Sequence, residues 1–178
     1  DGIAASVSYT KGFFTLGSTR GNGIIGENIT DNLKTIETLP KVLDKDIDIE
    51  VRGEAYMLRS VLDELNQERT NKGLDLFKNC RNAAGGSLRQ LDPNITKQRK
   101  LNTFSYTLVN PEKYNINTQI DALEFMKQCG FTVNTNYKHC KNVDEIIENL
   151  EYWKDNRKNL DYDTDGVVIK VIEFDLYE

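Results

Sequence analysis

The residue types that perform most hydrolytic and metal chemistry are scarce in this sequence. His139 is the single histidine, and Cys80, Cys129 and Cys140 show no C-x-x-C spacing. A Ser-His-Asp triad would have to use His139 as its base, and one His–Cys pair is too sparse for tetrahedral zinc. An odd number of scattered cysteines favours reduced thiols over a disulfide framework. Any chemistry is therefore expected to depend on Lys, Arg, Asp and Glu.

Lys170 is the first candidate, because it is a cation inside the apolar run 167–172. An unpaired ammonium is costly to bury, so a lysine placed there must reach solvent, pair with an acid or perform a function. Asp165 offers a carboxylate at the start of the same run. Two interpretations stay open, an edge-strand lysine exposed to water and a functional cation.

The alternating segment 46–57 supplies a second candidate. Its polar face carries Asp48, Glu50, Arg52 and Glu54. The pattern alone favours a solvated strand face. The alternative is the floor of a polar site, where the carboxylates would bind a ribose hydroxyl or orient a metal.

Two local motifs match ligand-binding patterns, but their surroundings argue against both ligands. Residues 21–26 read G-x-G-x-x-G, but they follow the second arm of a predicted hairpin and the charged Arg20, so a glycine-rich turn is favoured over a dinucleotide site. Residues 161–166 match the first half of an EF-hand loop. Its twelfth position would be Ile172 instead of Glu, which argues against calcium.

A basic stripe covers residues 78–100. It contains six cations and one acid, which are Lys78, Arg81, Arg89, Lys97, Arg99, Lys100 and Asp92. The net charge of the stripe is therefore +5, and the rest of the chain carries −10 to give the overall −5. Local positive charge attracts phosphate backbones even in an acidic protein. Ordinary surface charge is the alternative.

Composition limits the fold that must position these residues. The chain has 178 residues, of which 38% are hydrophobic and 29% charged, enough for a packed core with a solvated surface. No apolar run approaches the length of a membrane span, about 18 residues. The first residue is Asp1 and the last segment is strand-like, so we expect a piece of a longer protein.

The apolar periodicity predicts a mixture of strands and helices without regular βαβ alternation, which favours the α+β class. The expected strands are residues 3–9 and 13–19 as a hairpin, 46–57, 104–109, 131–133 and 166–174. The expected helices are 27–39, 60–72 with a capping box at Ser60–Asp63, 79–90, 120–129 ended by Gly130, and 143–153.

Taken in order, five motifs resemble the adenylation domain of bacterial NAD-dependent DNA ligases. They are D-G at 1–2, S-T-R-G-N-G at 18–23, E-V-R-G-E at 50–54, N-C-R-N-A-A-G-G-S-L-R-Q-L-D-P at 79–93 and D-G-V-V-I-K at 165–170. The resemblance covers essentially the whole chain. The last two motifs are specific in combination.

The resemblance implies a DNA-ligase-type nucleotidyltransferase (ATP-grasp-like) core, with antiparallel sheets and flanking helices around a nucleotide cleft. In that family a lysine attacks NAD to form lysyl-AMP and release nicotinamide mononucleotide. AMP then passes to the 5′-phosphate of a DNA nick, and the 3′-hydroxyl displaces it. NAD, Mg²⁺ and nicked duplex DNA are the implied ligands of a monomeric, cytoplasmic, nucleoid-associated bacterial enzyme that is not bound to a membrane.

The resemblance also assigns roles by position. Glu54 would bind the ribose, Arg20 the adenosine, Tyr106 would stack on the adenine, and Lys170 would approach the α-phosphate. Asp1 and Asp165 would join Lys170 in the catalytic group. Phosphates of the DNA or the adenylated end would be bound by Arg81, Arg89 and Arg157. The motifs leave the metal ligands unknown, with the neighbourhood of Glu54 as a candidate.

The sequence also departs from the family. The nucleophilic lysine of K-x-D-G would stand two positions before Asp1, and the last lysine motif would follow the chain, so residues 1–178 are expected to be an inactive fragment of the domain. Asn22, Cys80 and Ile172 stand where the family usually has Asp, Pro and Asn.

Two rival functions remain at this stage. A non-catalytic nucleic-acid-binding module would use the basic stripe, and its salt-sensitive DNA binding would not depend on Glu54 or Lys170. A nucleotidyltransferase that uses ATP would share the local motifs. A covalent AMP adduct formed from NAD would separate the three.

Overall fold

Alternating apolar residues build an antiparallel sheet with the strand order β2–β1–β3–β4. The computed structural model describes residues 1–177. The strands are β1 (Ile3–Thr10), β2 (Phe13–Thr19), β3 (Ile49–Tyr56) and β4 (Asn102–Leu108). The longer helices are α2 (Arg59–Asn71), α3 (Cys80–Leu88), α5 (Gln119–Cys129) and α6 (Val143–Asn156). Short helical segments are α1 (Thr30–Leu33), α4 (Pro93–Gln98), η1 (Pro111–Tyr114), η2 (Arg157–Asn159) and η3 (Phe174–Leu176). The α+β prediction is confirmed.

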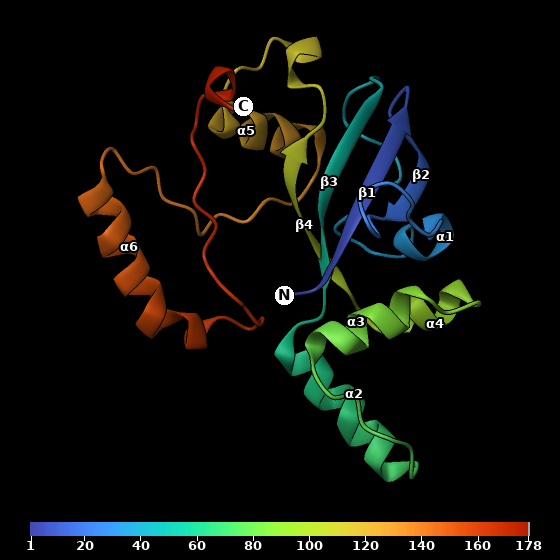
Figure 1. Cartoon of the computed structure of the whole chain (residues 1–178). Helices are drawn as coiled ribbons and strands as arrows, with labels where there is room; N and C mark the ends of the chain where they lie inside the picture. The colour runs from blue at the N-terminus through green and yellow to red at the C-terminus, as the bar shows by residue number, and fades with distance from the viewer. Residues whose placement is uncertain (178) are drawn as a thin grey trace.

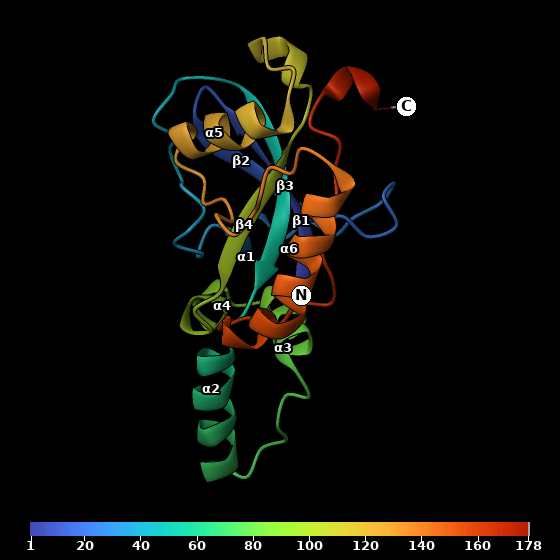
Figure 2. The same cartoon turned by 90° about the vertical axis from the view of Figure 1, so that its left-hand side faces the viewer.

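The two faces of the sheet have different environments. Val7, Val51 and Ala55 point to the buried face, where they pack with Leu33 of α1 and Met126 of α5. Figures 1 and 2 show α1 and α5 behind the sheet, while the face toward the viewer in Figure 1 has no helix laid across it. The open face is therefore the one that carries the polar residues of β3.

The predicted hairpin is confirmed. β1 and β2 are joined by Lys11 and Gly12, whose φ angles of 49° and 82° are both positive. Two central residues with positive φ give a type I′ turn, whose twist matches that of the strands it joins.

The glycine-rich segment after β2 is a closed loop. Asn22 Oδ1 accepts hydrogen bonds from the N–H groups of Ile24 at 2.9 Å and Ile25 at 2.8 Å. The Thr19 N–H donates to the Glu27 carbonyl at 2.9 Å and closes the base of the loop. Because β2 is a hairpin strand with an antiparallel neighbour, the turn interpretation is confirmed over the dinucleotide one.

The prediction of a helix over 27–39 is wrong in extent. Only α1 is helical, and the chain continues in tight turns, with the N–H of Ile36 donating to the Leu33 carbonyl and that of Leu39 to Ile36. The Thr35 hydroxyl donates to the Asn32 carbonyl at 2.7 Å. Such side-chain bonds compete with helical ones. The apolar periodicity nevertheless identified the buried side chains.

Two predicted strands are absent from the sheet. Residues 131–133 contribute one backbone bond, from the Ser105 N–H to the Thr132 carbonyl at 2.8 Å. Residues 166–173 belong to no strand and make only an isolated bridge between Glu173 and Thr118, Phe174 begins η3, and Val168 is 77% exposed. Alternation indicates extended backbone, whereas a ladder also needs a neighbouring strand, and the described residues offer none to 166–172.

The predicted capping box at Ser60–Asp63 is also wrong. Helix α2 begins one residue earlier, and its N-cap residue Leu58 makes no side-chain cap. Instead Asp161 accepts from the Ser60 N–H at 3.0 Å and from the Ser60 hydroxyl at 2.5 Å. The cap comes from a residue distant in sequence, which local spacing cannot reveal.

The remaining helix predictions agree with the structure apart from their exact ends. Asn79, Thr118 and Asn142 cap α3, α5 and α6, and Gly130 ends α5 with a φ of 110°. Helix α4 was not predicted. Within residues 1–177 no helix combines the length and apolar character needed to cross a lipid bilayer.

Candidate active site

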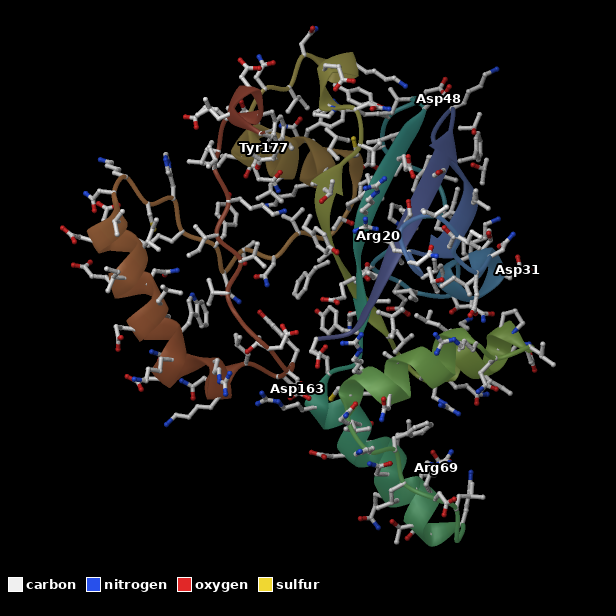
Figure 3. The ribbon with its side chains drawn as sticks, viewed as in Figure 1. Arg20, Asp31, Asp48, Arg69, Asp163 and Tyr177 are labelled. Atoms are coloured by element: carbon white, nitrogen blue, oxygen red, sulfur yellow. The ribbon has the colours of Figure 1, made fainter. Side chains whose placement is uncertain are left out.

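The open face of the sheet brings together charged residues of β3 and the arginine that follows β2. Arg52 lies opposite Ser6 of β1, and Glu54 lies opposite Ala4 of β1. Arg20 follows β2 directly, and its N–H donates to the Ala4 carbonyl at 3.1 Å. Figure 3 shows Arg20 over this face of the sheet. The polar side of the alternating segment 46–57 is therefore not a simple solvated face.

A β-bulge adds Tyr106 to this group. Arg52 pairs with Thr107 while Gly53 pairs with Ser105, so Tyr106 is the extra residue of β4. Bulges commonly redirect a side chain beside a functional site. Burial raises the pKa of Tyr106 and the charge of Glu54 adds to the rise, whereas Arg20 and Arg52 oppose it. These effects place all four side chains in one electrostatic neighbourhood.

Lys170 reaches the same neighbourhood from the C-terminal segment. Its Nζ lies 5.5 Å from the centroid of the Tyr106 ring, in a cation–π arrangement. Burial of the ammonium lowers the pKa of Lys170, although the residue as a whole is exposed. An aromatic face, two arginines, a carboxylate and a lysine can together hold a planar base, a hydroxyl-bearing sugar and a phosphate.

Asp1 and Arg81 lie together at the lower end of the sheet. Asp1 Oδ1 is 3.6 Å from Arg81 Nη1 at the start of α3. Nearby, Asp163 pairs with Arg59 at the start of α2, and Figure 3 shows Asp163 beside that end of the helix. Asp165 is exposed in the loop that leads toward Lys170.

The other predicted phosphate-binding arginines stand on separate elements. Arg89 follows α3, and its Nε lies 3.6 Å from Glu27 Oε2. Arg157 begins η2. The Arg59 side chain, at the start of α2, donates to the carbonyl of Leu160 just after η2 at 3.1 Å and so connects the two segments. Arg89 and Arg157 are both exposed.

Arg99 is the cation of the basic stripe that packs against the fold, because it is only partly exposed and lies over an aromatic ring. The Arg99 guanidinium lies 5.2 Å from the Phe77 ring centroid, with Arg69 at 4.5 Å from the same ring. Arg99 Nη1 also donates to Ser87 Oγ at 3.2 Å, and burial lowers the pKa of Arg99. The exposed cations of the stripe are Lys78, Arg81, Arg89, Lys97 and Lys100.

The residues present do not form a site for a magnesium ion. Within residues 1–177 no three His, Cys, Asp or Glu side chains are grouped as metal ligands. Glu54 shares its surroundings with Arg20 and Arg52, a donor set that disfavours a divalent cation. Of the EF-hand-like acids, Asp161 caps α2 and Asp163 pairs with Arg59.

Sequence reasoning missed two residues that hold the site together. Arg59 binds the loop 160–163, and Gln119 Nε2 donates to the Tyr106 carbonyl at 2.7 Å. Neither residue lies in a motif with chemical spacing. A helix-start signal could have drawn attention to Gln119, because it follows the Thr118 cap.

A small antiparallel sheet, covered by helices on one face and polar on the other, is consistent with the class of adenylation domains. The sequence matches the NAD-dependent DNA ligase adenylation domain family over residues 1–178. The chain belongs to this family.

Curated relatives agree with the family match. The chain is 50% identical over 178 residues to a DNA ligase of Acholeplasma laidlawii, covering all of this chain and 27% of the relative. It is 48% identical over 178 residues to a DNA ligase of Bacillus cytotoxicus, again covering all of this chain and 27% of the relative. A DNA ligase of Thermotoga neapolitana is 47% identical over 175 residues, which are 98% of this chain and 25% of that relative. The chain thus spans about a quarter of the length of these relatives.

Proposed function

We propose that this chain forms most of the adenylation domain of a DNA ligase that uses NAD and seals nicks in duplex DNA. The observation that carries the proposal is the meeting of Arg20, Glu54, Tyr106 and Lys170 on the open face of the sheet. Family membership supports it, because the matched family is described as NAD-dependent. The implied fold is a nucleotidyltransferase core of the ligase type.

Each side chain has a role that suits its chemistry. The Tyr106 ring offers a flat surface for the adenine, and Glu54 accepts hydrogen bonds from the ribose hydroxyls. Arg20 contacts the adenosine from the end of β2. Lys170 neutralises charge on the α-phosphate, which fits a lysine that is partly desolvated beside an aromatic ring.

We propose that the nucleophile of the reaction is the lysine of a K-x-D-G motif whose aspartate is Asp1. In the K-x-D-G motif the lysine precedes Asp1 by two positions, and its attack on the α-phosphate of NAD would release nicotinamide mononucleotide. Asp1, held by Arg81, would orient that lysine. Asp165 belongs to the proposed catalytic group because it precedes the segment that carries Lys170.

The DNA contacts are proposed for the exposed arginines. Arg81, Arg89 and Arg157 would bind phosphates at the nick, and the exposed lysines of the basic stripe would add sequence-independent attraction. The parent protein is proposed to act as a monomer on DNA of the bacterial cytoplasm.

The test uses the parent protein, extended to the length of its relatives. It is incubated with NAD labelled in the AMP half or with labelled ATP, and a covalent AMP adduct with the phosphoramidate signature, stable to alkali and released by acid, is sought. We expect an adduct with NAD that is lost in Lys170→Ala and Glu54→Ala. Lys127→Ala and Glu124→Ala, exposed changes on α5, serve as matched controls and should retain it.

Other outcomes would favour other functions. An adduct with ATP but not NAD would indicate the ATP-using class. DNA binding without any adduct, unaffected by Glu54 or Lys170, would indicate a binding module. Residues 1–178 alone should form no adduct, and an adduct there would refute the placement of the nucleophile.

A further inference from the structure

Gln119, the first residue of α5, makes two hydrogen bonds that join the segments carrying Tyr106 and Lys170. Its backbone N–H donates to the Ile172 carbonyl at 2.8 Å. Its side-chain Nε2 donates to the Tyr106 carbonyl at 2.7 Å. One half-buried residue therefore links the edge of the sheet to the C-terminal segment.

The lysine segment depends on few other bonds. Residues 166–172 belong to no strand ladder, and Lys170 lies two residues before the carbonyl that Gln119 binds. Additional bonds near this point join the Phe174 N–H to the Asn117 carbonyl at 2.9 Å and the Tyr177 hydroxyl to the Val171 carbonyl at 2.7 Å. All of these bonds except that of Tyr177 involve the chain just before α5 or its first residue.

The start of α5 is itself held firmly. Thr118 caps the helix by accepting from the Asp121 N–H at 3.1 Å, and Ala122 and Met126 are fully buried in the core. Figure 1 shows the C-terminal segment returning to the start of α5. Because α5 is fixed in the core, the two hydrogen bonds of Gln119 hold the segments of Tyr106 and Lys170 at fixed positions relative to this helix.

We propose that Gln119 is a positioning residue that sets the spacing between Tyr106 and Lys170, an inference that rests on the proposed function. A single AMP can stack on Tyr106 and place its phosphate at Lys170 only if these two side chains keep one separation. The neutral amide of Gln119 would keep this separation through its bond to the Tyr106 carbonyl, without contacting the AMP itself. Losing its side-chain bond should harm ligands that use both groups more than ligands that use Tyr106 alone.

The experiment measures AMP and adenosine affinity of the parent protein by calorimetry. We expect Gln119→Ala to weaken AMP binding about five- to tenfold, the usual effect of one lost hydrogen bond, while adenosine affinity changes less than about twofold. Gln67→Ala removes a matched glutamine from α2, where its amide bonds only to Asn71 at 3.3 Å, and should change neither affinity.

A double-mutant cycle with Lys170→Ala tests the route of the effect. If Gln119 acts by setting the spacing between Tyr106 and Lys170, Gln119→Ala should have little further effect on AMP binding once Lys170 is alanine. An equal loss in both backgrounds, or an equal loss for adenosine and AMP, would overturn the proposal and indicate general destabilisation.

Further variants separate a failure of this inference from a folding defect and from a failure of the proposed function. If Gln119→Ala fails to fold, Gln119→Glu keeps the shape, and its ionised carboxylate cannot donate to the Tyr106 carbonyl, so the same selective loss is expected. If Tyr106→Ala and Lys170→Ala leave AMP affinity unchanged, the proposed function fails. If they weaken it and neither Gln119 variant does, only this inference fails.

Discussion

Arg59 and Asp163, which are 104 residues apart in sequence, form a salt bridge in which Arg59 Nε lies 2.6 Å from Asp163 Oδ1. Arg59 Nη1 also donates to the Leu160 carbonyl at 3.1 Å. In the same loop, the Tyr162 hydroxyl accepts from Asn134 Nδ2 at 3.2 Å. The loop 160–163 is thus attached to the start of α2 before the chain continues to Lys170.

The Arg59–Asp163 pair should contribute modestly to stability. Both side chains are more than a third exposed, at 38% and 39%, so solvent screens their attraction. Asp163→Asn is expected to lower the free energy of unfolding by about 1 kcal/mol, measured by urea denaturation. Glu68→Gln, which disrupts the exposed pair with Lys72 on α2, is the control and should cause no measurable change. Equal effects of the two changes would contradict a specific role for Arg59 and Asp163.

The Asp161 cap of α2 should make stability depend on pH. Hydrogen bonds from the Ser60 side chain and then its backbone N–H lower the pKa of Asp161. A carboxyl with a lowered pKa in the folded state stabilises the protein above its unfolded pKa, near 3.9, and loses this contribution as the pH falls through the folded pKa. Asp161→Asn should therefore lower the thermal midpoint at pH 7, with the difference shrinking below about pH 3. A difference that is constant with pH would refute the assigned cause.

Tyr106 should bind the adenine through its ring, with no need for its hydroxyl. Tyr106→Phe is expected to keep AMP affinity within about threefold, whereas Tyr106→Ala should weaken it about tenfold or more, since stacking on a base contributes about 1–3 kcal/mol. Calorimetry with the parent protein measures both. Tyr152→Ala, an exposed aromatic change on α6, is the control. A loss in Tyr106→Phe as large as in Tyr106→Ala would indicate that the hydroxyl is the important group.

The absence of a side chain at Gly53 allows β3 and β4 to approach each other closely at the bulge. A Cβ at this position would collide with the Phe104 carbonyl, a backbone atom that cannot move aside easily. Gly53→Ala should therefore destabilise the protein by about 2 kcal/mol or more. Gly166→Ala is the matched control, because a Cβ there meets no atom within 4 Å. Urea denaturation compares the variants, and similar midpoints would show that the bulge can adjust.

The sequence alone determined the motifs and most of the local structure. Strand alternation identified β1, β2, β3 and β4, and the glycine stop at Gly130 marked the end of α5, because these signals depend on neighbours along the chain. The motifs at 79–93 and 165–170 also led to the family that the comparison confirmed.

Only the tertiary structure decided which distant residues meet. The bulge that adds Tyr106 to the open face, the Asp161 cap on Ser60 and the two bonds of Gln119 each join segments far apart in sequence. The same holds for residues 166–172, whose alternating pattern predicts a strand although no neighbouring strand pairs with them. Local periodicity fixes the conformation a segment favours, while hydrogen-bond partners between segments depend on how the whole chain packs.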